Sequence, residues 1–322
     1  MLIDCLLVAL GLTLLVGGGE ALVRGASGVA LKAKLSPSVV GLTIVAAGTS
    51  MPEFVVCTQS AMEGSPGLAM GNVVGSNIFN VGMILGLTAL VRPLQIKGNS
   101  IRLEWPVMML AALQLHLLAR DGMVDRLEGG VLLAGLVAFV SYMVWVSRTA
   151  MAPVEEEQFE KVATASFGRT GLPALLLNLG AIALGAALLA GGSTAMVRGS
   201  SAIAGALGVS DTVIGLTVVA AGTSMPELVT SLVASRRGQG DIAVGNVIGS
   251  SIFNVLGILG ATALIHPLEV APEITSRDSL WMLGATVLLF PLMRTGMRVT
   301  RLEGGLLFGG FVTYLVLLVL AA

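Results

Sequence analysis

The chain is short of charge. Only 11% of its 322 residues are Asp, Glu, Lys or Arg, whereas a soluble globular domain carries about 25%. Hydrophobic residues make up 55%, so the composition excludes a soluble domain and predicts an all-α polytopic protein embedded in a lipid bilayer. The formal net charge of −1 gives no sign of a nucleic-acid partner. The two cysteines, Cys5 and Cys57, lie in apolar segments and indicate neither a disulfide framework nor a metal site.

What the chain does have is an internal repeat. GLTIVAAGTSMPEFVV begins at Gly41 and GLTVVAAGTSMPELVT begins at Gly215, an offset of 174. Residues 41–90 align with 215–264 without a gap, and 30 of the 50 positions are identical. A second shared phrase follows in each copy, GNVVGSNIFN from Gly71 and GNVIGSSIFN from Gly245. The chain is therefore a duplicated unit, and the duplication decides how the rest is interpreted.

Apolar runs of about 20 residues predict ten transmembrane helices in two groups of five. We expect a first five-helix repeat over 1–147, a cytoplasmic linker over 148–171 and a second five-helix repeat over 172–322. An odd number of helices per repeat inserts the two copies in opposite directions, which is the inverted-repeat design of secondary transporters. The predicted helices are 3–30, 36–62, 67–91, 103–119, 128–147, 172–204, 210–235, 241–265, 278–294 and 302–321.

Basic residues in the short loops predict the orientation. With both termini outside the cell, 14 of the 18 Lys and Arg residues fall in loops on the inner side. The N-terminus has no basic region or small-residue cleavage signature, so we expect the first helix to be retained. The predicted location is the cell (inner) membrane. The oligomeric state is not predicted.

Each copy of GTSMPE places one glutamate, Glu53 or Glu227, inside an apolar segment of membrane-spanning length. Intramembrane acids are rare and usually mark an ion or substrate path. Pro52 and Pro226 lack the N–H that a helix would direct at the carbonyls of Gly48 and Gly222, so each helix should kink or break there. The carbonyls near Ala46 and Ala220 are then candidate cation ligands, as are the side chains Thr49, Ser50, Thr223 and Ser224.

A polar stripe at a spacing of four residues marks the next helix of each copy. It consists of Asn72, Ser76 and Asn80 in the first and Asn246, Ser250 and Asn254 in the second. Ser and Asn in membrane helices commonly make hydrogen bonds between helices. We favour Ser76 and Ser250 over Asn72 and Asn246 as ligands because each lies in the middle of its stripe.

No Lys or Arg occurs between Lys34 and Arg92, nor between Arg198 and Arg236. Each glutamate therefore has no basic partner in its own hairpin and must be protonated, paired with a distant helix or balanced by a cation. Two carboxylates that bind bidentately, with the carbonyls of Thr49 and Thr223, would supply six oxygens, within the range for Ca²⁺. The hydroxyl, amide and carboxylate inventory suits Na⁺ or Ca²⁺ and lacks the nitrogen and sulfur ligands of transition metals.

With these motifs the chain resembles the sodium/calcium exchanger family of cation/calcium antiporters. The resemblance covers about 50 residues per half closely. It implies a protein that is not an enzyme and needs no cofactor, with four central ion sites on helices 2, 3, 7 and 8. It also implies that the first and sixth helices slide to alternate access. Carried over by position, Ca²⁺ is held by Thr49, Glu53, Thr223 and Glu227, and Na⁺ by Ser50, Ser76, Ser224, Ser250 and the carbonyls of Ala46 and Ala220.

One position departs from the family. Its members often have an aspartate at a position matched here by Asn80 or Asn254, and this chain has amides at both. Two core carboxylates balance one Ca²⁺ or two Na⁺. We predict an antiporter that exchanges Na⁺ for Ca²⁺, with proton-coupled Ca²⁺ exchange as the alternative. A cation channel is less favoured, and an intramembrane hydrolase lacks a nucleophile beside a base.

Overall fold

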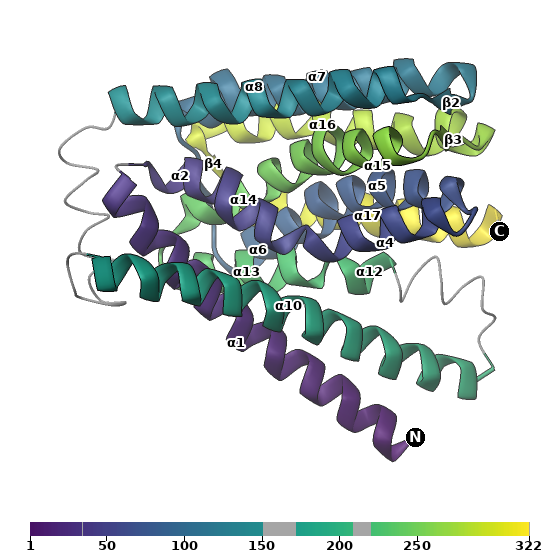
Figure 1. Cartoon of the computed structure of the whole chain (residues 1–322), viewed down its shortest axis with the longest axis horizontal. Coiled ribbons are helices and arrows are strands. Elements are labelled where there is room, and N and C mark those ends of the chain that lie inside the picture. Colours follow the sequence, from purple (N-terminus) through teal and green to yellow (C-terminus); the bar gives the residue numbers. More distant parts are fainter. Residues whose placement is uncertain (34, 151–171, 209–219, 322) are drawn as a thin grey trace. The chain divides into compact units, whose positions relative to one another are not determined.

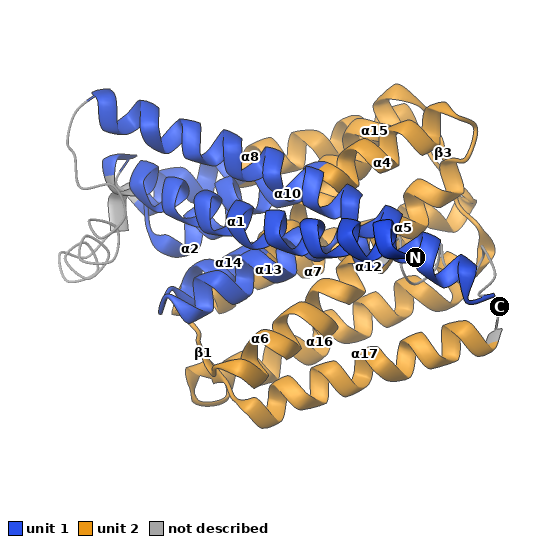
Figure 2. Cartoon of the chain, turned by 90° about the horizontal axis from the view of Figure 1, so that it is seen from below, with its two compact units in different colours: residues 1–51, 140–246 blue, residues 52–139, 247–322 orange. Residues whose placement is uncertain are grey.

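The computed structural model describes residues 1–33, 35–150, 172–208 and 220–321. These residues form two compact units, each discontinuous in sequence, which Figure 2 colours separately. Unit 1 comprises residues 1–51 and 140–246, and unit 2 comprises residues 52–139 and 247–322. Both predicted repeats therefore contribute to each unit. Most of the predicted linker, 151–171, lies outside the described residues.

Eight helices among the described residues are long and apolar enough to cross a membrane. A bent pair of helices, Pro37–Thr49 followed by Met51–Met62, makes a ninth if it is one span. The predicted segment 210–235 falls partly outside the described residues, so the ten-helix plan stays a prediction. The eight spans are Leu2–Ala30, Pro66–Val91, Ser100–Asp121, Arg126–Ser147, Leu172–Ala206, Gly240–Ile265, Ile274–Met297 and Arg301–Leu320.

Unit 1 is built on the long helices α1 (Leu2–Ala33) and α10 (Leu172–Ala206), which lie against each other (Figure 1). They run antiparallel, because Gly11 meets Gly192 while Gly18 meets Gly185. A Cβ added at Gly18 would lie 2.9 Å from the Gly185 carbonyl oxygen, and one at Gly192 would lie 2.8 Å from that of Gly11. Only glycine permits this backbone approach, which is how apolar helices associate in lipid.

The glycines at this contact recur every seven residues, at 11, 18 and 25 in α1 and at 185, 192 and 199 in α10. Seven residues are about two helical turns, so each set lies on one face. The two sets are also related by the repeat offset of 174. The same duplicated sequence therefore supplies both faces of the contact.

Five further helices, which lie wholly or partly in unit 1, carry the GTSMPE motifs or connect to them. Ser36 caps α2 (Pro37–Val40), and a π-helical turn, Gly41–Val45, leads to α3 (Ala46–Thr49). In the second repeat α12 (Ala220–Thr223) precedes α13 (Met225–Arg236), and α14 (Gly240–Ile252) follows. A Cβ at Gly41 would clash with the Ile242 carbonyl oxygen, so α14 packs directly on this backbone.

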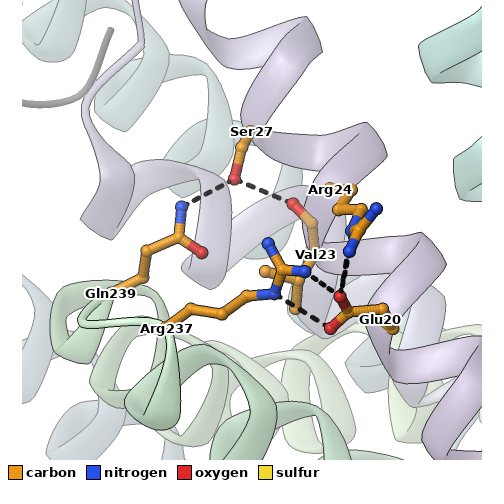
Figure 3. A network of polar contacts seen from close by, with 6 residues as sticks. All are labelled: Glu20, Val23, Arg24, Ser27, Arg237 and Gln239. Atoms are coloured by element: carbon orange, nitrogen blue, oxygen red, sulfur yellow. Dashed lines mark hydrogen bonds and ion pairs between the residues drawn. The ribbon is translucent and has the colours of Figure 1, made fainter. Parts of the chain in front are cut away.

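An ion-pair network joins α1 to the end of α13. Arg24 Nη2 donates to Glu20 Oε1 at 2.6 Å, and Arg237 Nε donates to Glu20 Oε2 at 2.9 Å. Figure 3 shows both guanidinium groups directed at this one carboxylate. Beside it, Gln239 Nε2 donates to Ser27 Oγ at 3.0 Å. The half-buried network anchors α1 next to the helix that carries Glu227.

Unit 2 contains the remaining helices (Figure 2). Close glycine contacts recur here: Gly86 packs on Gly304, and Gly129 packs on Gly260. These two pairs are equivalent under the repeat. Its complete helices are α5 (Pro66–Phe79), α6 (Gly86–Val91), α7 (Trp105–Leu118), α15 (Gly260–Ile265), α16 (Ser279–Arg294) and α17 (Arg301–Ala321). Unit 2 also includes α4 (Met51–Met62) without its first residue and the first part of α8 (Arg126–Ala150).

Two short antiparallel sheets close the helix hairpins of unit 2. Strand β1 (Leu94–Gln95) pairs with β4 (Arg298–Val299), and β2 (Met123–Val124) pairs with β3 (Leu268–Glu269). Each pair joins one repeat to the other. The repeat offset grows from 174 to 175 just before β4, where Met297 takes a left-handed backbone with φ 52°. The extra residue is therefore accommodated in a turn.

Candidate cation-binding residues

Both GTSMPE motifs break their helix at the same place, as the prolines predict. In the first repeat α3 ends at Thr49, Ser50 leaves the helical region with φ −83° and ψ 7°, and α4 begins at Met51. In the second repeat α12 ends before Ser224, which has φ −89° and ψ 5°. Each proline then occupies the first turn of the following helix, where a missing N–H costs nothing.

Some of the carbonyls near these breaks already accept hydrogen bonds. The Ala46 carbonyl accepts the Ser50 N–H at 3.0 Å and the Thr49 hydroxyl at 3.2 Å, so a cation there would displace a donor. The Gly222 carbonyl, which Pro226 leaves without its helical donor, accepts the hydroxyl of Ser193 on α10 at 2.7 Å. The repeat places Gly19 at the position of Ser193, and glycine has no hydroxyl to donate.

Glu227 lies at the start of α13 and is 1% exposed. Its Oε1 accepts the Ser50 hydroxyl at 2.8 Å, so a residue of the first motif contacts the acid of the second. Its Oε2 is buried and has no hydrogen-bond donor. No Lys or Arg forms an ion pair with Glu227 among the described residues. The carboxylate is thus half satisfied by one hydroxyl and keeps one open oxygen.

Asn246 organises the surroundings of Glu227. Its Nδ2 donates to the Glu227 carbonyl at 3.3 Å and to Ser231 Oγ at 3.0 Å, while its Oδ1 accepts the Thr49 hydroxyl at 3.2 Å. The polar stripe favours Ser250 over Asn246 as a ligand, and the contacts of Asn246 fit a positioning role. They also add Ser231, which sequence reasoning missed. The repeat equivalents make the matching contact, since Asn72 Nδ2 donates to Cys57 Sγ at 3.3 Å.

In unit 2 the predicted ligands lie on α4, on α5, at the end of α14 and on the π-helical stretches that follow α5 and α14. Glu53, Ser76 and Ser250 are all buried, at 1%, 4% and 0% exposed. Asn80 opens a π-helical stretch, Asn80–Leu85, and Asn254 is the second residue of another, Phe253–Leu259. π-helical turns are rare and occur frequently at functional sites. Both amides therefore lie at the start of a π-helical stretch, although three further stretches among the described residues, Gly41–Val45, Ser100–Glu104 and Ile274–Asp278, contain no predicted ligand.

The two amides are held by their nitrogens and leave their oxygens open. Asn80 Nδ2 donates to Ser251 Oγ at 3.4 Å, and Asn254 Nδ2 donates to Asn77 Oδ1 at 3.1 Å. The Oδ1 atoms of both residues are buried without a donor, as is the hydroxyl oxygen of Ser250. Buried oxygens normally have hydrogen-bond partners. Three such atoms at predicted ligand positions favour a cation as the missing partner.

The structure thus brings the predicted residues together in two groups. Thr49, Ser50 and Glu227 form one in unit 1, with Ala46, Ala220, Thr223 and Ser224 on the same broken helices. Glu53, Ser76, Asn80, Ser250 and Asn254 lie in unit 2. Within the described chain no group of three or more His, Cys, Asp or Glu residues is placed to hold a metal. The donors are hydroxyl, amide and carboxylate oxygens, which suit hard cations.

Comparison with known proteins identifies the class. Residues 4–145 and 177–320 match the family described as sodium/calcium exchanger protein, and the chain belongs to this family. It is therefore a multi-pass membrane transporter of the cation/Ca²⁺ antiporter class.

Particular relatives match over nearly the whole chain. It is 38% identical to the putative antiporter CaxA of Alkalimonas amylolytica, over 99% of both chains. It is 32% identical to the sodium/calcium exchanger MaX1 of Methanosarcina acetivorans, over 98% of both. Among solved structures it is similar to the sodium-calcium exchanger NCX_Mj soaked with 10 mM Na⁺ and zero Ca²⁺. That match has a TM-score of 0.83 and 28% identity and covers 98% of both chains.

Proposed function

We propose that this protein is a secondary antiporter that exchanges Na⁺ for Ca²⁺ by alternating access. The observation that carries the proposal is the set of buried oxygens without donors: Oε2 of Glu227, Oδ1 of Asn80 and Asn254, and Oγ of Ser250. A bound cation would supply the partner that these oxygens lack, and an unsatisfied polar group is costly in a membrane. A transported cation satisfies them only while it is bound.

Glu53 and Glu227 supply the charge that balances Ca²⁺, together with oxygens of Thr49 and Thr223. Ser50, Ser76, Ser224, Ser250, Asn80 and Asn254 and the carbonyls of Ala46 and Ala220 serve Na⁺. The Ser50 hydroxyl donates to Glu227, and its oxygen keeps lone pairs that can accept a cation. When Na⁺ binds, the hydroxyl oxygen is free to turn toward the ion.

The ten-helix inverted repeat belongs to the same proposal, with both termini outside and the ions bound near the midplane. The glycine contacts between α1 and α10 favour movement of these two helices as one body, because a shift of either alone would separate backbones that touch. Their sliding is the step that would alternate access. The proposed location is the cell (inner) membrane.

Proton coupling is the competing assignment, since the same glutamates could exchange protons for Ca²⁺. A proton needs one acceptor and no cage of further oxygens, whereas the open amide and hydroxyl oxygens suit Na⁺. We favour Na⁺ on this ground. A channel is less favoured because broken helices in an inverted repeat are typical of alternating access.

Counterflow in proteoliposomes separates these functions. Vesicles loaded with Na⁺ should accumulate ⁴⁵Ca²⁺ against its gradient, and vesicles with an imposed pH gradient and no Na⁺ should not. Uptake driven by the pH gradient alone would replace the proposal with proton exchange. Equilibration of ⁴⁵Ca²⁺ that needs no counter-ion would indicate a channel.

A further inference from the structure

A groove in unit 2, whose lining includes no predicted ion ligand, has the features of a ligand site. It lies between α16, α17 and the segment from Ile78 to Gly82, and it encloses about 410 Å³. That volume is typical of a site for a small molecule. Its walls are apolar, with Trp281, Leu288 and Phe311 among the lining residues. An apolar cavity on membrane-spanning helices does not hold ordered water, so its natural occupant is hydrocarbon.

The groove has room for a ligand because two glycines in its walls have no side chain. Gly284 of α16 and Gly310 of α17 both line it, and a Cβ added to either would meet no atom within 4 Å. Close helix packing does not explain these two glycines, in contrast to Gly86 and Gly304, whose backbones touch. The two open glycines keep space free for something other than protein.

The length of the groove corresponds to one leaflet of the membrane. Its lining along the span Ile274–Met297 extends from Arg277, near the start of that span, to Leu288. Eleven residues of helix rise about 16 Å, close to half of the roughly 30 Å hydrocarbon core. One acyl chain that enters at the membrane surface would fill it.

The surface end of the groove is dipolar. Arg277 Nε donates to Asp278 Oδ1 at 2.8 Å and Nη2 donates to Oδ2 at 3.2 Å, so the guanidinium and carboxylate lie side by side. The Tyr314 hydroxyl donates to the same Asp278 Oδ1 at 3.2 Å. Arg277 is 35% exposed and lines the groove, so N–H groups not used by Asp278 remain for a ligand.

A second, more polar hollow of about 630 Å³ adjoins this end and shares Ser276 and Leu280 with the groove. Its lining also holds both charge signs, Arg120 and Asp121. A head group at the mouth of the groove would thus meet paired charges of opposite sign. The charge of Arg277 would add little to the binding free energy of an anionic head group, because this charge is already balanced by Asp278.

We propose that this groove binds one acyl chain of a phospholipid whose head group carries both a phosphate and an ammonium, as in phosphatidylethanolamine. The phosphate accepts hydrogen bonds from Arg277 and the ammonium lies near Asp278. The chain extends past Trp281 and between Gly284 and Gly310. The proposal does not depend on which ions the protein exchanges.

Lipid retention by matched glycine variants tests the groove. Gly310→Leu and Gly284→Leu each place a side chain in it, and Gly309→Leu is the control, because Gly309 is the neighbouring open glycine of α17 and does not line the groove. After exchange into detergent, native mass spectrometry should detect one phosphatidylethanolamine on the wild type and on Gly309→Leu. We expect at least a tenfold lower bound fraction in both groove variants. Equal retention by all four proteins would overturn the proposal.

A fluorescence measurement tests the same site in folded protein. With Trp105 and Trp145 replaced by Phe, Trp281 is the remaining tryptophan. Phosphatidylethanolamine with a brominated chain, added to delipidated protein, should quench its emission at lower lipid concentration than brominated phosphatidylglycerol does. Filling the groove with Gly310→Leu should abolish this difference. Tighter binding of the anionic lipid, or quenching unchanged by Gly310→Leu, would contradict the assignment.

Discussion

The hydroxyl of Ser50 donates to Glu227 Oε1 at 2.8 Å, so two residues 177 positions apart along the chain share a hydrogen bond. Ser50 belongs to the first GTSMPE motif and Glu227 to the second. A duplicated sequence does not by itself require its copies to touch. Here the hydroxyl of the serine that ends the broken helix of one copy donates to the carboxyl group of the other, which couples the two motifs directly.

Glu227→Gln should abolish Ca²⁺ exchange without unfolding the protein. A neutral amide leaves a divalent ion short of one negative charge where water screens little. We expect at least about a tenfold loss of Na⁺-driven ⁴⁵Ca²⁺ flux, since each 1.4 kcal/mol of lost binding is a factor of ten. Glu53→Gln should behave alike. The exposed Glu63 gives the control, Glu63→Gln, which should transport normally. Near-normal flux in either buried variant would refute its assignment.

Asn254→Asp should change how exchange depends on pH. The added carboxyl group is neutral at acid pH and then resembles the native amide, whereas at alkaline pH it adds a charge and holds cations more tightly. The largest departure from the wild type is therefore expected on the alkaline side. The exposed Asn99→Asp should leave the profile unchanged. Superimposable profiles for folded Asn254→Asp would mean that this position does not contact the ions.

Adjacent glycines of α1 should respond in opposite ways to alanine. At Gly18 the new Cβ would lie 2.9 Å from the Gly185 oxygen, and the resulting overpacking costs roughly 1–3 kcal/mol. At Gly17 it meets nothing within 4 Å, so Gly17→Ala should be neutral or stabilising by up to about 1 kcal/mol. Apparent Tm in detergent measures both. Equal values would show that α1 and α10 do not make this backbone contact.

Ser193→Ala should lower stability because it removes the donor to the Gly222 carbonyl. An orphaned buried acceptor costs about 1–3 kcal/mol. The neighbouring Thr194→Ala is the matched control, since its exposed hydroxyl only donates back to Ala190 within α10. Thermal unfolding should separate the two variants by several degrees. If Ser193→Ala were as stable as Thr194→Ala, the hydrogen bond from Ser193 to the Gly222 carbonyl would not contribute to stability.

Cysteine labelling checks the orientation. In a Cys5→Ser background, the remaining native Cys57 is buried. A cysteine introduced at residue 63 should react with a membrane-impermeant reagent from outside intact cells, and one at 156 should react only after lysis. External labelling at 156 would invert the predicted topology.

Much of the helical plan could be predicted from the sequence, because in a membrane an apolar run of sufficient length must become a helix. The helix predicted over 67–91 is observed as the span Pro66–Val91. The break after Thr49 followed from the proline at 52, whose missing N–H is a local property. The glycine spacing of seven does not by itself predict a partner, so the pairing of α1 with α10 required the structure.

The remaining features depend on neighbours that the sequence does not supply. Ser193 reaches the Gly222 carbonyl only because α10 packs beside α12. Asn246 contacts Thr49 across nearly 200 residues of sequence. The π-helical stretches at Asn80 and Asn254 have no residue signature, because the same side chains could equally form regular α-helix. Local pattern predicts elements, and packing decides which polar atoms keep a partner.

Each of the four short strands pairs with a strand of the other repeat, which suggests how this architecture arose. β1 and β3 occupy equivalent places in the two repeats, as do β2 and β4, yet β1 pairs with β4 and β2 pairs with β3. That reciprocity is the isologous symmetry of a homodimer. A half-length ancestor that formed such a homodimer would have made both sheets from a single gene product. Fusion of two such genes would then have required only a linker, because the interface between the two subunits already existed.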